Sequence, residues 1–326
     1  MRERMNIRGR IPPTEPEASR RRSSRLRLRV AWMYYAEDMT QGAIAEKLGI
    51  GRVTVTRLLA DARAMHEVSI SLAREISDLP RLEIALERRF GLREAVVAPL
   101  SSPEADPTVA IGAATGEFLS GFMRPDVRIG VGWGRTLHSS LDFVQSGQAD
   151  TVVSLLGGIS AVDRYNPAEF AWAFARIFKA RCFLVAAPAI VDDKDTKRRL
   201  IEHCGVGASL SRTEDLDAVL LSAGGIPQAS PHIDGPLTAE VRDELARAGA
   251  VGNVLYNFFD ARGRLVGHPV NDRVMSAPIE TLCRAPVRIL ASGGREKIDA
   301  LHGAMALIRP TVLITDESTA AALLAD

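Results

Sequence analysis

The chain contains few cysteines, histidines and aromatic residues. Its 326 residues include 3 cysteines and 6 histidines, and Phe, Trp and Tyr together make up 5%. Cys182, Cys204 and Cys283 are odd in number, far apart and set in apolar or mixed surroundings, so we expect buried thiols rather than a disulfide framework. No spacing of His or Cys residues is typical of a metal site. The sequence therefore predicts neither a metal nor a cofactor.

Long apolar runs are also absent. No window approaches the roughly 18 uncharged apolar residues of a membrane span, and the arginine-dotted N-terminus lacks the apolar core of a signal peptide. A composition that is 46% hydrophobic and 25% charged is typical of a soluble globular protein. We therefore expect a cytoplasmic protein with no membrane partner. The length indicates roughly two domains.

The net charge of +1 hides a strong segregation of charge along the chain. Residues 1–66 carry 14 Lys and Arg against 7 Asp and Glu, a balance of +7, whereas residues 67–326 carry 27 against 33, a balance of −6. Clustered positive charge indicates a polyanionic partner, because each neutralised phosphate releases counterions. For residues 1–24, which hold three prolines and little apolar content, we expect a disordered basic arm.

Residues 25–72 carry the pattern of a helix-turn-helix domain. Apolar residues recur at helical spacing in RLRLRVAWMYYAED. The segment MTQGAIAEKLGIGRVTVTRLLADARA then predicts a helix that Thr40 caps and Gly49 ends, followed by a second helix that starts near Arg52. Two short helices joined by a glycine turn are typical of this DNA-binding motif. The strand-like VSISL, residues 68–72, makes the domain winged-helix-like. The alternative is a plain helical hairpin in a core.

The beginning of the second helix is the candidate DNA-reading element. The first residues of a recognition helix lie against base edges, where Arg can bind guanine and Thr can bind a base or a phosphate. The start of the preceding helix would hold a phosphate. With operator DNA as the partner, the candidate DNA-binding residues are Thr40, Gln41, Arg52, Thr54, Thr56 and Arg57.

The rest of the chain predicts an α/β domain. Residues 73–90 form a connecting segment with a helix from about residue 80 that Gly91 ends. In residues 91–326, amphipathic segments that predict helices separate seven apolar runs: AVVAPL, VRIGVGWG, TVVSLLGG, CFLVAAP, AVLLSAGG, VRILASGG and TVLITDE. Uninterrupted apolar strands that alternate with helices favour a parallel sheet covered on both faces. Ligands of such sheets bind beyond the carboxyl ends of the strands.

The loop GVGWGRTL, residues 130–137, is a candidate ligand-binding element. Its glycines alternate and lack the spacing of a dinucleotide-binding loop, and no Lys followed by Ser or Thr makes it a Walker A loop. Its amides and the hydroxyl of Thr136, ahead of a helix from about Leu137, suit a phosphate or a group of sugar hydroxyls. Trp133 is expected either to form a wall of the ligand site or to pack in the core.

Six motifs occur in a fixed order: MTQGAIAEKLGIGRVTVTRLL, GVGWGRTL, LLGG, VGNVLYNFFDARG, ASGGREK and TDESTA. In these motifs the chain resembles the sugar-binding transcriptional regulators of the SorC (DeoR-related) family, from about Arg25 to the C-terminus. The resemblance implies an effector domain with the fold of glucosamine-6-phosphate deaminase and ribose-5-phosphate isomerase, fused to the DNA-binding domain. It also implies a homo-oligomer, usually a tetramer. The implied effector is a small sugar, a sugar phosphate or a polyol such as erythritol.

The resemblance also implies an effector site. Its residues are Gly132, Gly134, Arg135, Thr136, Gly157, Gly158, Asp260, Gly293, Gly294, Lys297, Asp316 and Glu317, with the loop facing Asp260 and Lys297. Many members of the family have a Gly-Arg pair where this chain has Tyr256 and Asn257. A cation that could pair with an effector phosphate is therefore missing there, and a neutral polyol is at least as plausible an effector.

Two functions follow from these observations. The first is a transcriptional repressor of a carbohydrate or polyol catabolism operon, with no catalytic residues, whose effector changes the spacing of its DNA-binding domains. The alternative is a sugar-phosphate isomerase or deaminase with an added DNA-binding domain. In such an enzyme Asp260, Lys297, Asp316 and Glu317 would supply acid and base groups around a sugar carbonyl. The segregated charge and the helix-turn-helix pattern favour the regulator, because an enzyme alone needs neither.

Overall fold

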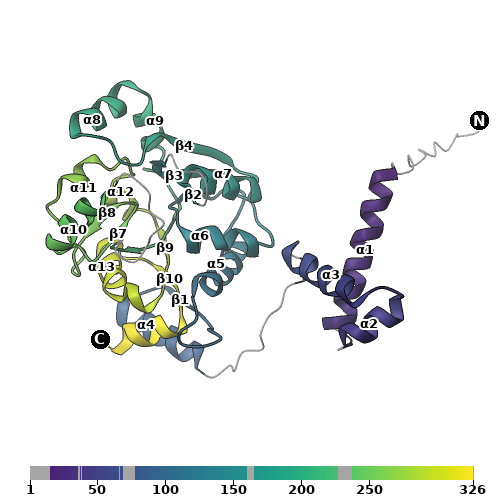
Figure 1. Ribbon diagram of the computed structural model, residues 1–326. Helices are drawn as coiled ribbons and strands as arrows, with labels where there is room; N and C mark the ends of the chain where they lie inside the picture. Colours follow the sequence, from purple (N-terminus) through teal and green to yellow (C-terminus); the bar gives the residue numbers. More distant parts are fainter. Residues whose placement is uncertain are drawn as a thin grey trace, which may run out of the picture. The chain divides into compact units, whose positions relative to one another are not determined.

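The chain divides into two compact units, Met1–Ala73 and Arg74–Asp326 (Figure 1). The computed structural model describes residues 15–35, 37, 39–65, 67–68, 78–159, 165–226 and 237–325. Most of the strand-like segment at residues 68–72, and residues 1–14 of the expected basic arm, lie outside the described residues.

The N-terminal unit is built from three helices: α1 Glu15–Tyr35, α2 Gln41–Leu48 and α3 Arg52–Ala64. The first helix begins at Glu15 and not at Arg25, so the expectation of a disordered arm is wrong for residues 15–24. The physical reason is that acidic residues suit the first turn of a helix and that Ala and Arg favour helix formation, whereas the weak apolar content of this stretch indicated disorder.

Helix α2 begins and ends where the sequence predicted, and α3 begins where it predicted. Thr40 caps α2 by accepting a hydrogen bond from the backbone N–H of Ala43 at 3.2 Å, and Gly49 ends it in the left-handed conformation with φ of 63°. Helix α3 follows at once from Arg52. The three helices share one buried apolar cluster, formed by Val30, Ala31, Met33, Ile44, Ala45, Val55, Leu58, Leu59 and Ala62.

The larger unit contains a parallel sheet of seven strands in the order β1-β10-β9-β5-β2-β3-β4. All seven predicted strands are confirmed: β1 Glu94–Ala98, β2 Arg128–Val131, β3 Thr151–Gly158, β4 Arg181–Pro188, β5 Ala218–Leu221, β9 Val287–Ala291 and β10 Val312–Asp316. A small antiparallel sheet, which the sequence did not predict, is formed by β6 Gly224–Gly225, β7 Gly252–Val254 and β8 Asn257–Phe259.

Helices connect the strands, as the alternating pattern predicted. Gly91 ends α4 at the predicted place, with φ of 65°. The helices are α4 Leu79–Phe90, α5 Thr108–Phe122, α6 Arg135–Ser140, α7 Pro167–Ile177, α8 Lys194–His203, α9 Val206–Ser211, α10 Ala239–Arg247, α11 Pro269–Arg273, α12 Ile279–Leu282, α13 Ile298–Ile308 and α14 Glu317–Ala325. Short 3-10 turns lie at Leu141–Phe143 and Arg295–Lys297.

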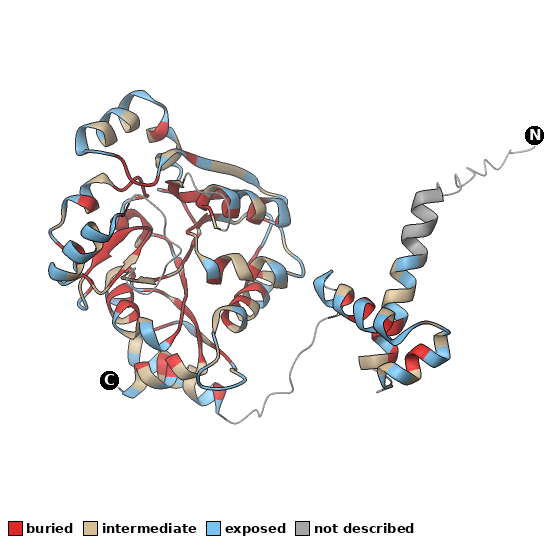
Figure 2. Ribbon diagram, viewed as in Figure 1, coloured by how far each residue is buried: buried red, intermediate tan, exposed pale blue. Residues whose placement is uncertain are grey.

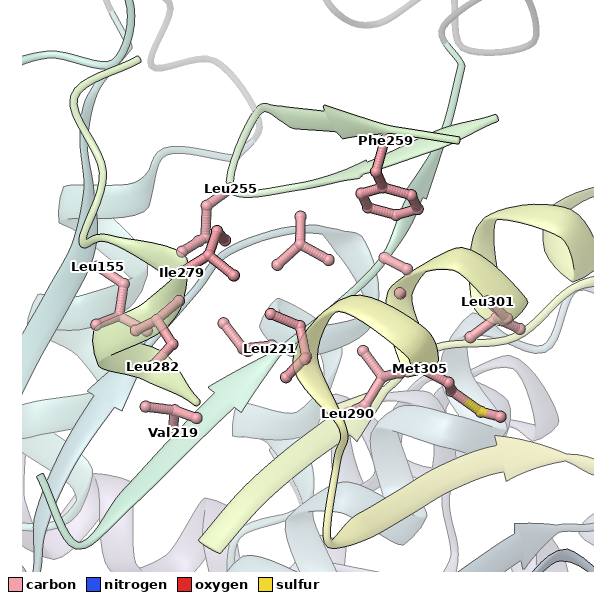
Figure 3. Close-up of a cluster of buried hydrophobic side chains, with 14 of the residues drawn as sticks. Leu155, Val219, Leu221, Leu255, Phe259, Ile279, Leu282, Leu290, Leu301 and Met305 are labelled. Carbon is pink, nitrogen blue, oxygen red and sulfur yellow. The ribbon is translucent and has the colours of Figure 1, made fainter. Parts of the chain in front are cut away.

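The large sheet is buried on both faces except at the edge strand β4, whose residues are mostly exposed or half-buried (Figure 2). Successive side chains of a strand point to opposite faces, and in β5 Val219 and Leu221 belong to one apolar cluster while Ala218 and Leu220 belong to the other. Helices α5, α6 and α7 cover the second cluster. The first cluster is covered by α4, α10, α12, α13, α14 and the small sheet. Figure 3 shows Leu221 of the large sheet among side chains of α12, α13 and β8.

No helix in the described part of the chain is long and apolar enough to span a membrane. In the same part, no three His, Cys, Asp or Glu side chains are grouped as a metal ion would require. The expectation of buried thiols is wrong for Cys204, which is exposed at the end of α8. Cys182 and Cys283 are half-buried, and burial raises the pKa of both thiols.

Candidate functional site

The loop after β2 is the first element of the candidate site. Because every strand of the large sheet is parallel, all carboxyl ends lie at one edge. At this edge the backbone N–H of Gly132 donates to the carbonyl of Leu220 at 2.8 Å. A Cβ atom at Gly132 would lie 3.3 Å from that oxygen and 3.3 Å from the side chain of Leu255, so glycine permits the close approach. Gly134, with φ of 132°, then leads directly into α6.

Two side chains of this loop, Trp133 and Thr136, are packed against the protein, and a third, Arg135, carries a charge. Thr136 is buried in the first turn of α6. Trp133 packs against Tyr256, with ring centroids 5.5 Å apart and planes tilted by 43°. Arg135 is half-exposed and extends its guanidinium toward a carboxylate that the sequence analysis did not select, that of Asp106. The loop is thus a close-packed connection that presents one cation.

Asp106 brings two of the predicted residues into one cluster. Its Oδ2 lies 3.8 Å from Nη1 of Arg135, and its Oδ1 accepts a hydrogen bond from the backbone N–H of Thr108 at 2.9 Å. The hydrogen bonds with Thr108, and then the charges of Arg135 and Lys297, lower the pKa of Asp106. Asp106 follows β1, Arg135 follows β2 and Lys297 follows β9, so three strand ends supply this cluster. The Asp-Pro pair before α5, at a strand-to-helix junction, was the available sequence signal.

Lys297 is the second cation of the cluster. It ends the 3-10 turn after β9, and its burial lowers the pKa of its amine, while the carboxylate of Glu296 acts in the opposite direction. Arg135 lowers the pKa further, and Asp106 and Asp316 raise it. Lys297 therefore interacts electrostatically with Arg135, as expected for residues of one site.

Asp316 holds the backbone that carries Lys297. It is fully buried at the end of β10 and accepts hydrogen bonds from the backbone N–H of Gly294 at 3.1 Å, the hydroxyl of Ser318 at 2.7 Å, and the N–H and hydroxyl of Thr319 at 2.9 and 2.6 Å. A Cβ atom at Gly293 would overlap Oδ2 of Asp316. Asp316, Gly293 and Gly294 therefore shape the loop from within. Glu317, the next residue, is half-buried in the first turn of α14.

Asp260, which was expected to face the loop, makes its hydrogen bonds within its own turn. Both oxygens of its carboxylate are engaged within its own turn: the backbone N–H groups of Arg262 and Arg264 donate to Oδ1, and the guanidinium of Arg264 donates to Oδ2 at 2.9 and 2.7 Å. This turn packs beside Gly303 in the middle of α13, whereas Lys297 precedes the first turn of that helix. The motif order placed Asp260 after a strand, but that strand belongs to the small sheet.

Tyr256 and Asn257, where the chain departs from the pattern of the family that it resembles, hold a tight turn between β7 and β8. Leu255 and Tyr256 both have positive φ, 52° and 60°. The side-chain amide of Asn257 donates to the carbonyls of Val254 and Leu255 at 3.2 and 3.0 Å and to the hydroxyl of Ser276 at 3.0 Å. Asn257 thus has a structural role, and Arg135 and Lys297 supply the cations at this edge.

The two glycines at the end of β3 complete the set of predicted residues. The backbone N–H of Gly157 donates to the carbonyl of Met275 at 2.9 Å, and the carbonyl of Gly158 accepts from the N–H of Ala189 at 2.7 Å. They lie at the same carboxyl edge, on the third of the seven strands in chain order. No contact of the described residues links them to the cluster of Asp106, Arg135 and Lys297.

In the N-terminal unit the predicted DNA-binding residues lie at the beginnings of α2 and α3. Of these, Arg52, Arg57 and Thr56 are exposed. The hydroxyl of Thr56 lies 2.9 Å from Oε1 of Gln41 and 3.1 Å from the carbonyl of Arg52, so it joins the two helices. Thr40 is exposed, Thr54 is half-buried, and the exposed Val53 between the predicted residues was not selected from the sequence.

Comparison with known proteins gives consistent matches along the chain. A family model described as "Putative sugar-binding domain" matches residues 74–325. The deoxyribonucleoside regulator of Bacillus subtilis is 30% identical over 94% of this chain and 99% of its own length. The erythritol catabolism regulatory protein EryD of Brucella abortus is 30% identical over 92% of this chain and 96% of its own. The crystal structure of the full-length sorbitol operon regulator SorC from Klebsiella pneumoniae is 29% identical, covers 92% of this chain and 98% of its own, and superposes with a TM-score of 0.71.

Proposed function

Because the chain belongs to the SorC family of sugar-binding transcriptional regulators, we propose that it represses a carbohydrate or polyol catabolism operon and releases its operator when a small effector binds the larger unit. In this proposal α2 and α3 are the helix-turn-helix that binds the operator. The larger unit is the effector domain, with the fold of glucosamine-6-phosphate deaminase and ribose-5-phosphate isomerase. The family match and the parallel sheet of the larger unit support this assignment.

The observation that carries the effector site is the cluster of Asp106, Arg135 and Lys297. Parallel sheets bind ligands beyond the carboxyl ends of their strands, and three separate strand ends bring these residues to that edge. Their guanidinium, ammonium and carboxylate groups can donate to and accept from sugar hydroxyls. Gly134 and Thr136 lie beside Arg135 in the chain and complete the proposed contact region.

The cluster allows both an anionic and a neutral effector. Arg135 and Lys297 are suited to a phosphate, whereas Asp106 and Glu296 nearly balance their charge. The named relatives regulate deoxyribonucleoside, erythritol and sorbitol genes, so the family tie alone selects no single compound. The effector is therefore proposed only as a small sugar, a sugar phosphate or a polyol.

An oligomer is part of this proposal. Helix-turn-helix proteins read two half-sites whose separation matches their own symmetry. A homodimer or homotetramer whose effector changes the separation of its DNA-binding units would lose operator affinity without any change in the DNA contacts.

One observation bears on the enzymatic alternative. A lysine with a lowered pKa, such as Lys297, is a possible nucleophile or base. Two of the three carboxylates that would assist it are otherwise engaged, since Asp260 binds Arg264 and Asp316 binds the backbone around Gly294. We therefore propose a sensor. Incubation with sugar phosphates tests this choice, because conversion at an enzymatic rate would overturn it.

The proposed effector site is tested by isothermal titration calorimetry on the full chain. The panel contains erythritol, sorbitol, deoxyribose and the phosphate ester of each. One of these compounds should bind the wild-type protein, and Arg135→Ala or Lys297→Met should weaken that binding at least tenfold. Arg198→Ala is the matched control, because Arg198 is an exposed arginine of the same unit that pairs with Asp195 on α8. Equal weakening by the control variant would contradict the site.

A further inference from the structure

Val53 is an apolar side chain in an unusual place. It is the second residue of α3 and is 84% exposed, more than any other large hydrophobic side chain among the described residues. Helix α3 buries Val55, Leu58 and Leu59 on its opposite side. A branched apolar side chain here contributes nothing to the core of the N-terminal unit.

The surroundings of Val53 indicate what kind of surface it meets. Single exposed hydrophobic residues are common on proteins, so exposure alone says little. The other exposed residues of the first turns of α3 are Arg52, Thr56 and Arg57, which bear positive charge or a hydroxyl group. An apolar protein partner would remove water from both guanidinium groups and offer no hydrogen bond in its place. A polyanion with an isolated methyl group in its groove replaces that water, because its phosphates pair with the arginines.

The hydroxyl of Thr56 is engaged within the N-terminal unit, so few side chains of α3 remain to contact bases. The single hydroxyl proton of Thr56 is directed to Gln41 or to the carbonyl of Arg52. Thr56 therefore positions α2 against α3, and its hydroxyl is less available to bases. In the first turn of α3, Arg52 and Val53 are the exposed side chains.

We propose that Val53 packs on the C5-methyl group of a thymine in the operator and thereby specifies thymine at that position. The inference rests on the proposed function, in which α3 enters the major groove. The first residues of a recognition helix contact base edges, and the thymine methyl is the apolar group that the major groove of B-DNA presents. Arg52 and Arg57 contact phosphates or guanines on either side of this methyl.

The test uses the full-length protein and the DNA sequence that it enriches from a random pool. Each thymine of that sequence is replaced in turn by deoxyuridine, which lacks only the methyl group, and binding is measured by fluorescence anisotropy. One thymine in each half-site should show roughly fourfold weaker binding, the effect of burying one methyl group less. Val53→Ala should bind the unmodified operator several-fold more weakly and show no further loss with deoxyuridine at that position.

Met65→Ala is the matched control, because Met65 is an exposed apolar residue at the other end of α3. This variant should keep the full deoxyuridine penalty. If Val53→Ala also keeps it, or if no thymine shows a penalty, Val53 does not read a methyl group while the DNA-binding function stands. If the protein enriches no sequence at all, the DNA-binding function fails, and this inference fails with it.

Discussion

Asp316→Asn replaces one oxygen of a fully buried carboxylate by an NH₂ group and should destabilise the larger unit strongly. Oδ2 accepts from the backbone N–H of Gly294 and from the Thr319 hydroxyl, and Oδ1 accepts from the backbone N–H of Thr319 and from the Ser318 hydroxyl. The two hydroxyl groups can rotate and accept a hydrogen bond instead. The two backbone N–H groups cannot, so either orientation of the new amide places its NH₂ group against a backbone donor.

The magnitude follows from these contacts. The variant loses one hydrogen bond to a charged group, about 1.5–3 kcal/mol, and leaves a buried backbone donor unsatisfied, about 1–3 kcal/mol, with partial overlap between the two effects. We expect the free energy of unfolding of the larger unit to fall by roughly 3 kcal/mol. Because the backbone of Gly294 leads to Lys297, affinity for the effector should fall as well.

Urea unfolding followed by tryptophan fluorescence measures this loss. Trp32 is exposed in the N-terminal unit, so a Trp32→Phe background leaves Trp133 and Trp172 as reporters of the larger unit alone. Ser318→Ala is the control, since it removes one rotatable hydroxyl donor and should cost no more than about 1 kcal/mol. A loss below about 1 kcal/mol in Asp316→Asn would show that the carboxylate does not hold this loop, and would refute the reasoning.

The remaining predictions concern four sites. Because burial lowers the pKa of Lys297, this residue loses its charge at a lower pH than an exposed lysine. Calorimetry should therefore show the affinity for a phosphorylated effector falling as the pH rises in the wild-type protein but not in Lys297→Arg. An equal fall of affinity in both proteins would contradict the contact of Lys297 with the effector. Asp260→Ala should lower the melting temperature, because its carboxylate holds the turn before Arg264, and should leave effector affinity unchanged; a loss of affinity would restore Asp260 to the site. Tyr256→Phe removes a buried hydroxyl that has no hydrogen-bond partner among the described residues, so calorimetric melting should occur at an equal or higher temperature, and a clear drop would reveal a partner. Arg52→Ala combined with Arg57→Ala should weaken operator binding at least roughly tenfold in anisotropy titrations, with effector affinity as the unchanged control.

The elements that follow a local rule were predictable from the sequence. The Thr40 cap, the Gly49 end of α2 and the seven apolar strands depend on side chains within a few residues, and the structure confirms them. The small antiparallel sheet was missed because β6, β7 and β8 span only two or three residues each, and because β6 pairs with β7 across a long sequence separation. Such short strands carry no periodic signal.

The candidate site was predicted less completely, because its residues meet only through the sheet. Arg135 and Lys297 were selected by motif, and the strand order brings both near Asp106. Asp106 itself lies in a loop without a repeated pattern, so no spacing pointed to it, and the Asp-Pro pair before α5 was not used. Asp260 was selected by motif order, which does not reveal which sheet a strand joins, and its carboxylate is engaged by Arg264 within its own turn.

Operator release tests the central claim most directly. A fluorescent DNA fragment of the enriched sequence is bound by the full-length protein, and a compound that binds in calorimetry is titrated into the complex. The wild-type protein should release the DNA as the compound saturates it. A protein with Arg135→Ala and Lys297→Met should bind the same DNA with unchanged affinity and retain it at these concentrations. Release of this variant at the wild-type concentration of compound, or no release of the wild-type protein, would contradict the account.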